Sequence, residues 1–347
     1  DPADALVCAR GAMAAAEAAA ARERPVGGPT ASGAVTEDAA RACTLAGRAL
    51  EATGAYDEAL AAYSRAVALG PDLPAAASLR GALASRALRE RLSAIDGDIF
   101  ITSYPKSGTT WMQQIACMLC GEPADVHIQS RAPWAEAGLA TGALSLSELG
   151  SAAARPRIFK THAAWGALPV AGCGDAPPRG VRVIVVVRDP RDVMVSLYYH
   201  SRAIRAISYA GTAPRPSAPL PPGLGARSRR DLAGSWDEWH DLWMRGEAPL
   251  PMGGDGVDWF EHTRGWRDVA LRCPRQVLWV AYESLLRDAV AEVRRVGEFL
   301  GVPVSESRVR EIATASGFAQ MKARHDASDG LAGAHLRHAG EAGHFRR

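Results

Sequence analysis

The sequence is sparing in cysteine, in aromatic residues and in net charge. Six cysteines in 347 residues are too few for a disulfide scaffold. Forty basic and thirty-eight acidic side chains leave a formal charge of +2, so a nucleic acid is not expected as a partner. No apolar run approaches the roughly 18 residues of a membrane-spanning helix, and no signal peptide pattern is recognised. We therefore expect a cytoplasmic protein without a membrane span.

Two of the cysteines, Cys117 and Cys120, form a CxxC pair inside the apolar run IACMLC. No second ligand pair accompanies them, so we interpret them as buried helix residues, with a metal or redox pair as the alternative. Hydrophobic residues make up 48% and charged residues 22% of the chain, which is ordinary for a globular protein and excludes a disordered or fibrous one.

The first ninety residues are rich in alanine, arginine and glutamate, which favours helix throughout. Small and aromatic residues recur between 41 and 73, and Gly81 follows Gly47 by 34 positions. The segment 1–90 thus resembles a tetratricopeptide repeat, with one unit over about 40–73 and Gly54 at its turn. A module for partner binding or spacing is the favoured interpretation, and an alanine-rich helical hairpin packed on a neighbouring domain is the alternative.

Residues 24–36, RPVGGPTASGAVT, are expected to form a flexible loop within this N-terminal segment. A second long loop is predicted over 206–231, which is rich in proline and arginine. Loops of that length are uncommon without a role, so we expect this one to cover an acceptor site.

From Asp98 onward, short β-rich runs alternate with helical ones. Strands are predicted over 98–103, 157–160, 183–188 and 276–281. Helices are predicted over 109–120, which reads as amphipathic, 192–205 and 289–300. Apolar strands separated by helices indicate an α/β domain over 95–347 with a central parallel sheet flanked by helices. Ligands of such sheets bind at the carboxyl ends of the strands.

A glycine-containing loop, YPKSGTTW at 104–111, joins the first predicted strand to the first long helix. Gly108 lets the backbone curl so that its amides point at an anion bound at the helix N-terminus, and Lys106 adds charge. Further donors come from the hydroxyls of Ser107, Thr109 and Thr110. The loop is P-loop-like but not a Walker A motif, because its lysine precedes the glycine and no first glycine exists. This order argues against a kinase or GTPase.

The loop resembles the 5′-phosphosulfate loop of the sulfotransferase family. Members of that family transfer a sulfuryl group from 3′-phosphoadenosine 5′-phosphosulfate (PAPS) to an alcohol, phenol or amine. The string RDPRDVMVS, with Arg188 and Ser196 eight residues apart, resembles the family's site for the 3′-phosphate. The string FKTH holds Lys160 and His162, and its resemblance to the cytosolic branch implies that the histidine is the catalytic base.

The same resemblance implies further contacts to the donor. Contacts to adenine and the nearby phosphate are expected from Trp111, Tyr282, Ser316 and Phe318. At the C-terminus, Arg337 and Gly340 stand where the family has the pattern RKGxxGxW. Here the lysine is replaced and one residue is inserted before Gly340. Arg337 is still predicted to reach the 3′-phosphate.

Together these residues predict in-line sulfuryl transfer that needs no metal. Lys106 and Lys160 are expected to stabilise the leaving oxygen. The resemblance implies that His162 takes the acceptor's proton and that Ser196 holds Lys106 back until the donor is engaged. The product of the donor is 3′,5′-bisphosphoadenosine (PAP). Expected partners are a small-molecule alcohol, phenol or amine and, through the N-terminal repeats, a protein. The alternative is a catalytically weak nucleotide-binding scaffold whose repeats bind a protein partner.

Overall fold

The computed structural model describes residues 7–8, 10–15, 18, 29–53, 55–69, 73–141, 144, 156–168, 176–178, 180–209, 235–246, 248 and 258–327. The chain divides into two compact units. One consists of Asp1–Arg86 and Pro216–Asp258, and the other of Ala87–Arg215 and Trp259–Arg347.

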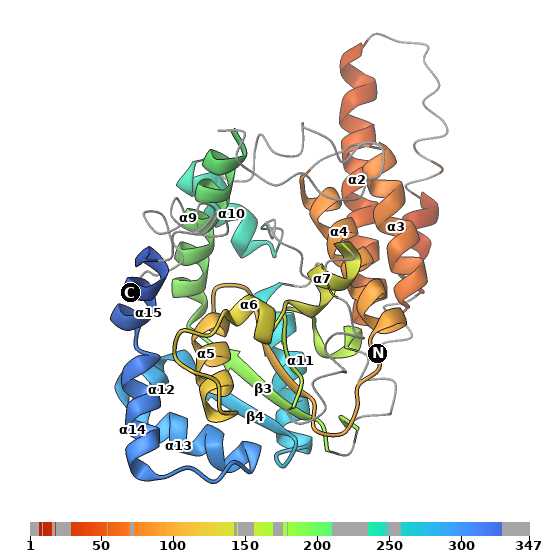
Figure 1. Ribbon diagram of the computed structural model, residues 1–347. Coiled ribbons are helices and arrows are strands. Elements are labelled where there is room, and N and C mark those ends of the chain that lie inside the picture. Colours follow the sequence, from red (N-terminus) through yellow and green to blue (C-terminus); the bar gives the residue numbers. More distant parts are fainter. Residues whose placement is uncertain are drawn as a thin grey trace. The chain divides into compact units, whose positions relative to one another are not determined.

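The first unit is built on a helix pair, α2 (Pro29–Ala52) and α3 (Tyr56–Leu69), joined by a short turn (Figure 1). Buried residues of α3 recur at helical spacing, so one face of this helix packs inward. Tyr63 is fully buried against Gly47, where an added Cβ would lie 2.5 Å from the tyrosine ring. Small residues on α2 therefore let the ring of α3 fill the space between the helices, as the sequence pattern indicated.

The beginning of α2 differs from the expectation for 24–36. The helix starts at Pro29, so the predicted loop is wrong over 29–36. Proline suits the first turn of a helix because its missing N–H would have no intrahelical partner there. Residues 24–28 and Gly54 lie outside the described residues. The tetratricopeptide character of this unit stays a prediction.

Two further helices of this region are α4 (Leu73–Arg91), which extends past the last residue of the first segment of the unit, and α10 (Trp236–Met244). Described residues of 7–18 are helical as well. A capping box starts α10: the Ser235 hydroxyl accepts from the Glu238 N–H while the Glu238 carboxylate accepts from the Ser235 N–H. The Arg48 guanidinium of α2 donates to the carbonyl of Gly246, just after α10.

The second unit contains a parallel sheet in the order β2-β1-β3-β4. Its strands are β1 (Ile99–Ser103), β2 (Ile158–Thr161), β3 (Arg182–Val187) and β4 (Val277–Ala281). Every residue of β1 is buried, which explains why the strand lacks the alternation of polar and apolar residues seen in half-exposed strands. The four predicted strands and the α/β class are confirmed.

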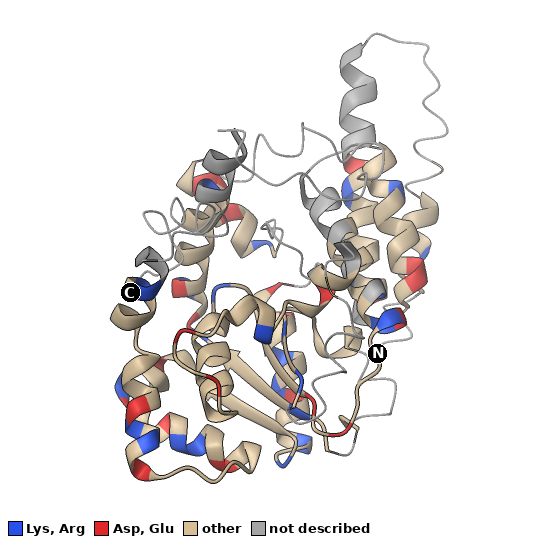
Figure 2. Cartoon of the chain, viewed as in Figure 1, with Lys and Arg blue, Asp and Glu red and all other residues tan. Residues whose placement is uncertain are grey.

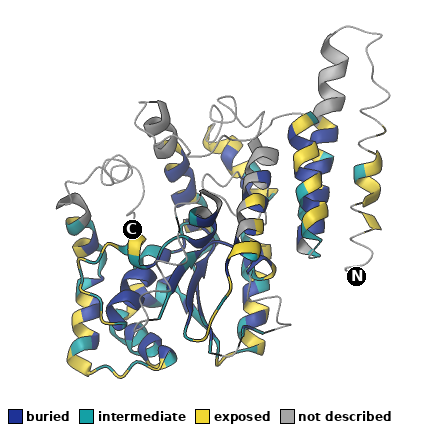
Figure 3. Cartoon of the chain, turned by 45° about the vertical axis from the view of Figure 1, so that its right-hand side comes forward, coloured by how far each residue is buried: buried dark blue, intermediate teal, exposed yellow. Residues whose placement is uncertain are grey.

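Helices cover both faces of the sheet. The alternate residues Ile99, Ile101 and Ile184 pack with α5 (Thr109–Leu119), α13 (Ala289–Leu300) and α14 (Glu306–Ala315). Their neighbours Phe100, Phe159 and Val183 pack with α11 (Trp259–Arg272) and α7 (Ala135–Thr141) on the opposite face. Most residues of β1, β2 and β3 are accordingly dark blue in Figure 3. Shorter elements are α6 (Ile128–Arg131), η1 (Trp165–Ala167), α12 (Tyr282–Arg287) and α15 (Phe318–Ala327).

Helix α5 has no exposed polar face, although the predicted amphipathic helix implied one. All of its residues except Thr110 and Trp111 are buried, because α13 and α14 pack against it on the covered face of the sheet. Its buried glutamine is only partly satisfied: the Gln113 amide donates to the Ala132 carbonyl at 2.7 Å, while its Oε1 has no hydrogen-bond partner among the described residues. Cys117 is a buried free thiol, as predicted, and burial raises its pKa to about 12. Cys120 is also free and lies half-buried just after the helix.

Helix α9 (Pro190–Tyr209) is longer than the predicted 192–205, so the proposed long loop starts later. Residues 210–231 of that loop lie outside the described residues. Charges of both signs alternate along α13 and α14 (Figure 2), where Arg294 pairs with Glu306 at 2.7 Å. Among the helices that the structure describes, none is long and apolar enough to cross a membrane.

Candidate active site

The loop after β1 curls tightly before α5 begins. Lys106 and Gly108 both have positive φ angles, 71° and 103°. An added Cβ at Gly108 would also lie 2.6 Å from the ring of Tyr282, so only glycine fits. The Thr109 and Ser103 hydroxyls share a hydrogen bond of 2.6 Å, which ties the loop to the end of the strand. At the start of α5 the Trp111 N–H donates to the Gly108 carbonyl at 3.0 Å. The N–H groups before it, which helix geometry leaves without an intrahelical acceptor, can bind an anion.

Three cations meet where three neighbouring strands end. Lys106 follows β1, Lys160 lies in β2, and Arg188 follows β3. Burial and the charges of Lys160 and Arg188 lower the pKa of Lys106 to about 7. Burial also lowers the pKa of Lys160 to about 8. An anion bound among these groups would relieve their repulsion, so the cluster has the character of an anion site.

Arg188 is held from several sides. Its guanidinium lies 4.5 Å from the centre of the Tyr282 ring, donates to the Lys106 carbonyl at 3.4 Å and pairs with Asp192 at 3.5 Å. The residue is only 7% exposed, and its Nε atom has no hydrogen-bond partner within the described part of the chain. A buried guanidinium with a free donor fits a phosphate ligand.

His162 is oriented by its neighbours. Its Nδ1 lies 2.8 Å from the carbonyl oxygen of Ser103, which can only accept, so Nδ1 carries the proton and Nε2 keeps its lone pair. The ring of Trp134 stands edge-on to it at 5.2 Å. Burial and the nearby Lys160 hold the pKa of His162 well below its usual range. The imidazole is therefore neutral at pH 7, as a general base must be.

The predicted adenine-binding residues come together on the other side of the loop. The Trp111 indole donates to the Ser316 hydroxyl at 3.4 Å, and its ring meets that of Tyr282 at 5.6 Å. Phe318 begins α15, two residues after Ser316. Loop, strand-end and helix-end residues that are far apart in sequence thus form one continuous site.

The remaining predicted residues lie in the loop, in α5, in α9 and outside the described part of the chain. Ser196 is buried in α9, two turns after Arg188, and no hydrogen bond joins it to Lys106 among the described residues. Ser107 is fully buried, whereas Thr110 is half-buried at the start of α5. Arg337 and Gly340 lie outside the described residues.

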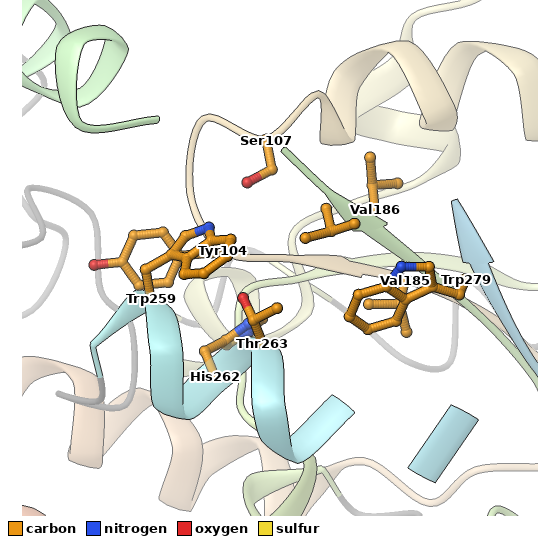
Figure 4. Close-up of a pocket in the computed structure, with 9 residues that line it drawn as sticks. Tyr104, Ser107, Val185, Val186, Trp259, His262, Thr263 and Trp279 are labelled. Atoms are coloured by element: carbon orange, nitrogen blue, oxygen red, sulfur yellow. The ribbon is translucent and has the colours of Figure 1, made fainter. Parts of the chain in front are cut away.

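A narrow pocket opens beneath the loop, between β3 and α11 (Figure 4). It is lined by Tyr104, Ser107, Trp259, His262 and Thr263 together with residues of β3 and β4. Within the described chain, the Ser107 hydroxyl and the Nε2 atom of His262 have no hydrogen-bond partner, although both are buried. Burial lowers the pKa of His262 to about 4, so this second histidine is neutral.

The sequence patterns did not single out His262 or Glu136, which accepts a hydrogen bond from the backbone of His162. Glu136 precedes the strand end that it contacts by more than twenty residues, and no motif links the two. His262 sits in the stretch WFEHTRGW, which indicated only the order of elements. In the described residues, no group of three or more His, Cys, Asp or Glu side chains could hold a metal ion.

The fold and site define an α/β protein with a cluster of cationic side chains at the carboxyl ends of a parallel sheet, where ligands of such folds bind. The chain belongs to the sulfotransferase family, since the model of the sulfotransferase domain matches residues 96–346. The predicted membership is confirmed.

Relatives of known name support this assignment. Mouse Sulfotransferase 2B1 is 33% identical over 246 residues, which cover 69% of this chain and 60% of that protein. Human Sulfotransferase 2A1 is 27% identical, with 68% of this chain and 70% of that protein covered. The chain therefore spans about 60% of the length of the mouse relative.

A solved structure from Arabidopsis thaliana, assigned as a steroid sulphotransferase, resembles the fold. It matches with a TM-score of 0.50 and 22% identity, over 76% of this chain and 81% of that one. At this identity the likeness concerns the fold alone.

Proposed function

We propose that this chain is a PAPS-dependent sulfotransferase that acts on a hydroxyl or amine of a small molecule. The observation that carries the proposal is the meeting of Lys106, Lys160 and Arg188 with the free Nε2 of His162 at the ends of β1, β2 and β3. We assign the activity to a domain over 95–347. A cytoplasmic location stays a prediction.

The residues present fit a donor with two phosphorylated ends. The curled loop, with Lys106 and the first amides of α5, would hold the phosphosulfate. Arg188, with its unpartnered Nε, would bind the 3′-phosphate, with Ser196 and Arg337 as further proposed contacts. The aromatic pair Trp111 and Tyr282 would hold adenine. Ser316 and Phe318 would flank it.

Once bound, the donor would supply the sulfuryl group. The neutral Nε2 of His162 would accept the proton of the attacking hydroxyl, while its Nδ1–H stays on the Ser103 carbonyl. Lys106 and Lys160 would place positive charge where the leaving oxygen becomes negative. Because the amides and ammonium groups are in position beforehand, little reorganisation is needed during transfer.

Residues 1–90 are proposed to be a separate helical module of the tetratricopeptide type that binds a protein partner. The close packing of Tyr63 on Gly47 supports a helix-turn-helix unit of this kind.

The test is a transfer assay with labelled PAPS and a panel of phenols, aliphatic alcohols, amines and sugars, with PAP binding followed by calorimetry. We expect label transfer to at least one acceptor class and saturable PAP binding. PAP binding without transfer would favour the nucleotide-binding scaffold. Neither binding nor transfer, or magnesium-dependent ATP hydrolysis instead, would refute the proposal.

A further inference from the structure

Glu136 is a buried carboxylate beside the proposed catalytic histidine for which the mechanism above has no use. The residue is 4% exposed and is the second residue of α7. Its Oε1 accepts the backbone N–H of His162 at 2.5 Å. Its Oε2 is buried and has no hydrogen-bond partner among the described residues. Burying a carboxylate is costly unless it is paired or hydrogen-bonded, so its position beside His162 calls for an explanation.

The segment that carries Glu136 runs along the end of β2. The Lys160 N–H donates to the Pro133 carbonyl at 2.9 Å, and Trp134 pairs with Lys160 as an isolated parallel bridge. The Trp134 ring lies 4.6 Å from Lys160 Nζ and edge-on to His162. One short stretch therefore contacts both chemically active residues of β2's end.

Electrostatics point the same way. Lys160 faces the cation Lys106 and the neutral rings of His162 and His200, all of which are buried with it or held near it. Burial lowers the pKa of Lys160 to about 8, and the Glu136 carboxylate opposes this decrease. Burial raises the pKa of Glu136 itself, and the hydrogen bond from the His162 backbone, together with the side chains of Trp134 and Thr161, opposes that rise.

Lysine is also rare in this protein. Only three of the forty basic residues are lysines, at positions 106, 160 and 322. An ammonium group can lose its proton when buried, whereas a guanidinium cannot. A nearby carboxylate can therefore help to keep Lys160 protonated, whereas an arginine would stay charged without one.

We propose that Glu136 is a positioning residue for the end of β2, holding the backbone of His162 through one oxygen and keeping Lys160 charged through its negative charge. This inference rests on the proposed function, because both residues it acts on belong to the proposed transfer site. Glu136 itself contacts neither donor nor acceptor.

Two substitutions separate the two roles. Glu136→Gln keeps an oxygen that can accept from His162 but removes the charge. Glu136→Asp keeps the charge but is one methylene too short to maintain the hydrogen bond. The readout is the titration of Lys160, followed by NMR in the unliganded full-length protein with isotope-labelled lysine. The chain gives three lysine side-chain signals, and Lys322 serves as an internal reference.

We expect Glu136→Gln to lower the pKa of Lys160 by about half a unit or more, with Lys322 unchanged. In Glu136→Asp we expect the pKa of Lys160 to stay near its original value, while kcat falls about fivefold or more and the donor KM changes little. An unchanged Lys160 titration in Glu136→Gln would overturn the charge role. Wild-type turnover in Glu136→Asp would overturn the hydrogen-bond role.

If Glu136→Gln does not fold, the aspartate variant decides alone: a Lys160 titration displaced from wild type would refute the charge role. The matched control is Glu122→Gln, which removes a half-buried carboxylate that pairs with Arg131 at 2.7 Å. It should leave Lys160 and turnover unchanged. Because the titration needs no substrate, it can succeed even if no acceptor is found, so failure of the proposed function is recognised separately.

Discussion

The helix pair α2–α3 and the ends of β1, β2 and β3 differ in how their buried polar groups are hydrogen-bonded. The interior of the helix pair consists of apolar residues, many of them alanine, and one ring, and its buried hydroxyl groups are hydrogen-bonded: Tyr63 donates to Glu51 at 2.7 Å and Thr44 to Ala40. At the strand ends, buried polar atoms of Ser107 and Arg188 have no partner within the described structure. The first region is arranged for stability, whereas the second keeps groups in reserve for a ligand. Substitutions should therefore affect different properties in the two regions.

The largest effect is expected at His162. Replacing it with alanine removes the proposed base, so turnover should fall by about 10²–10⁴, or roughly 3–5 kcal/mol of barrier, with little change in PAP affinity. The measurement is kcat with labelled PAPS, with PAP binding by calorimetry as the folding check. His127→Ala, at an exposed histidine, is the control. Turnover within twofold of wild type would remove His162 from its role.

Arg188→Ala should act on nucleotide recognition. Loss of a charge-assisted contact is expected to weaken PAP binding by about 10- to 100-fold, with a smaller effect on adenosine 5′-phosphate, which lacks the 3′-phosphate. Calorimetry with both nucleotides measures the difference. Arg191→Ala, at an exposed arginine paired with Asp189, should bind both normally. Equal weakening of both ligands would contradict the assignment.

Gly47→Ala tests the other side of the comparison. The new methyl group would lie 2.5 Å from the Tyr63 ring, so we expect a loss of about 1–3 kcal/mol of stability in the helix pair. Hydrogen exchange of the amides of α2 and α3 should report faster opening, while turnover of the folded protein stays the same. Gly265→Ala is the control, since nothing lies within 4 Å of its added Cβ. Unchanged protection in Gly47→Ala would show that the ring is not tightly packed.

The smallest effect concerns pH. Lys106 has a pKa of about 7 without ligand, and a bound anion should raise it, so binding should take up a proton. PAP affinity should therefore be highest below pH 7, where Lys106 is already protonated. It should fall by at most about tenfold per pH unit as the pH rises above 7. Calorimetry in buffers of different ionisation enthalpy measures the proton uptake. Affinity that is flat between pH 7 and pH 9 would contradict the shift.

The lowered pKa values of Lys106 and Lys160 also affect stability, and here the pH dependence runs in the opposite direction to that of PAP affinity. The unfolded chain binds more protons than the unliganded native protein between the native pKa values, about 7 and 8 for Lys106 and Lys160, and the ordinary lysine value. The contribution of these lysines to unfolding free energy therefore rises with pH across that range and is lost as pH falls through about 8 and 7.

Much of the architecture could be predicted because it follows local rules. The strands were recognised from continuous apolar runs, and the loop from one glycine placed between a strand and a helix. Burial of α5 could not be predicted, because Gln113 and Gln114 look exposed in sequence and their amide groups donate to carbonyls of later loops. The start of α2 was missed because glycine, serine and threonine near Pro29 resemble a loop.

The candidate site divides in the same way. Lys106, Lys160, His162 and Arg188 stand in short motifs at strand ends and were found from sequence. Glu136 and His262 reach the site through tertiary packing of α7 and α11, which no local pattern encodes. Even the tautomer of His162 depends on the Ser103 carbonyl, 59 positions earlier.

The depressed pKa of Lys106 has a chemical consequence beyond binding. An amine that sheds its proton near neutrality is a nucleophile, open to carbamylation and to imine formation with small aldehydes. Most cationic side chains of this protein are guanidinium groups, which lack that reactivity. An anion that restores the proton on Lys106 therefore also lowers the reactivity of this amine, so Lys106 should be least prone to carbamylation and imine formation when the anion is bound.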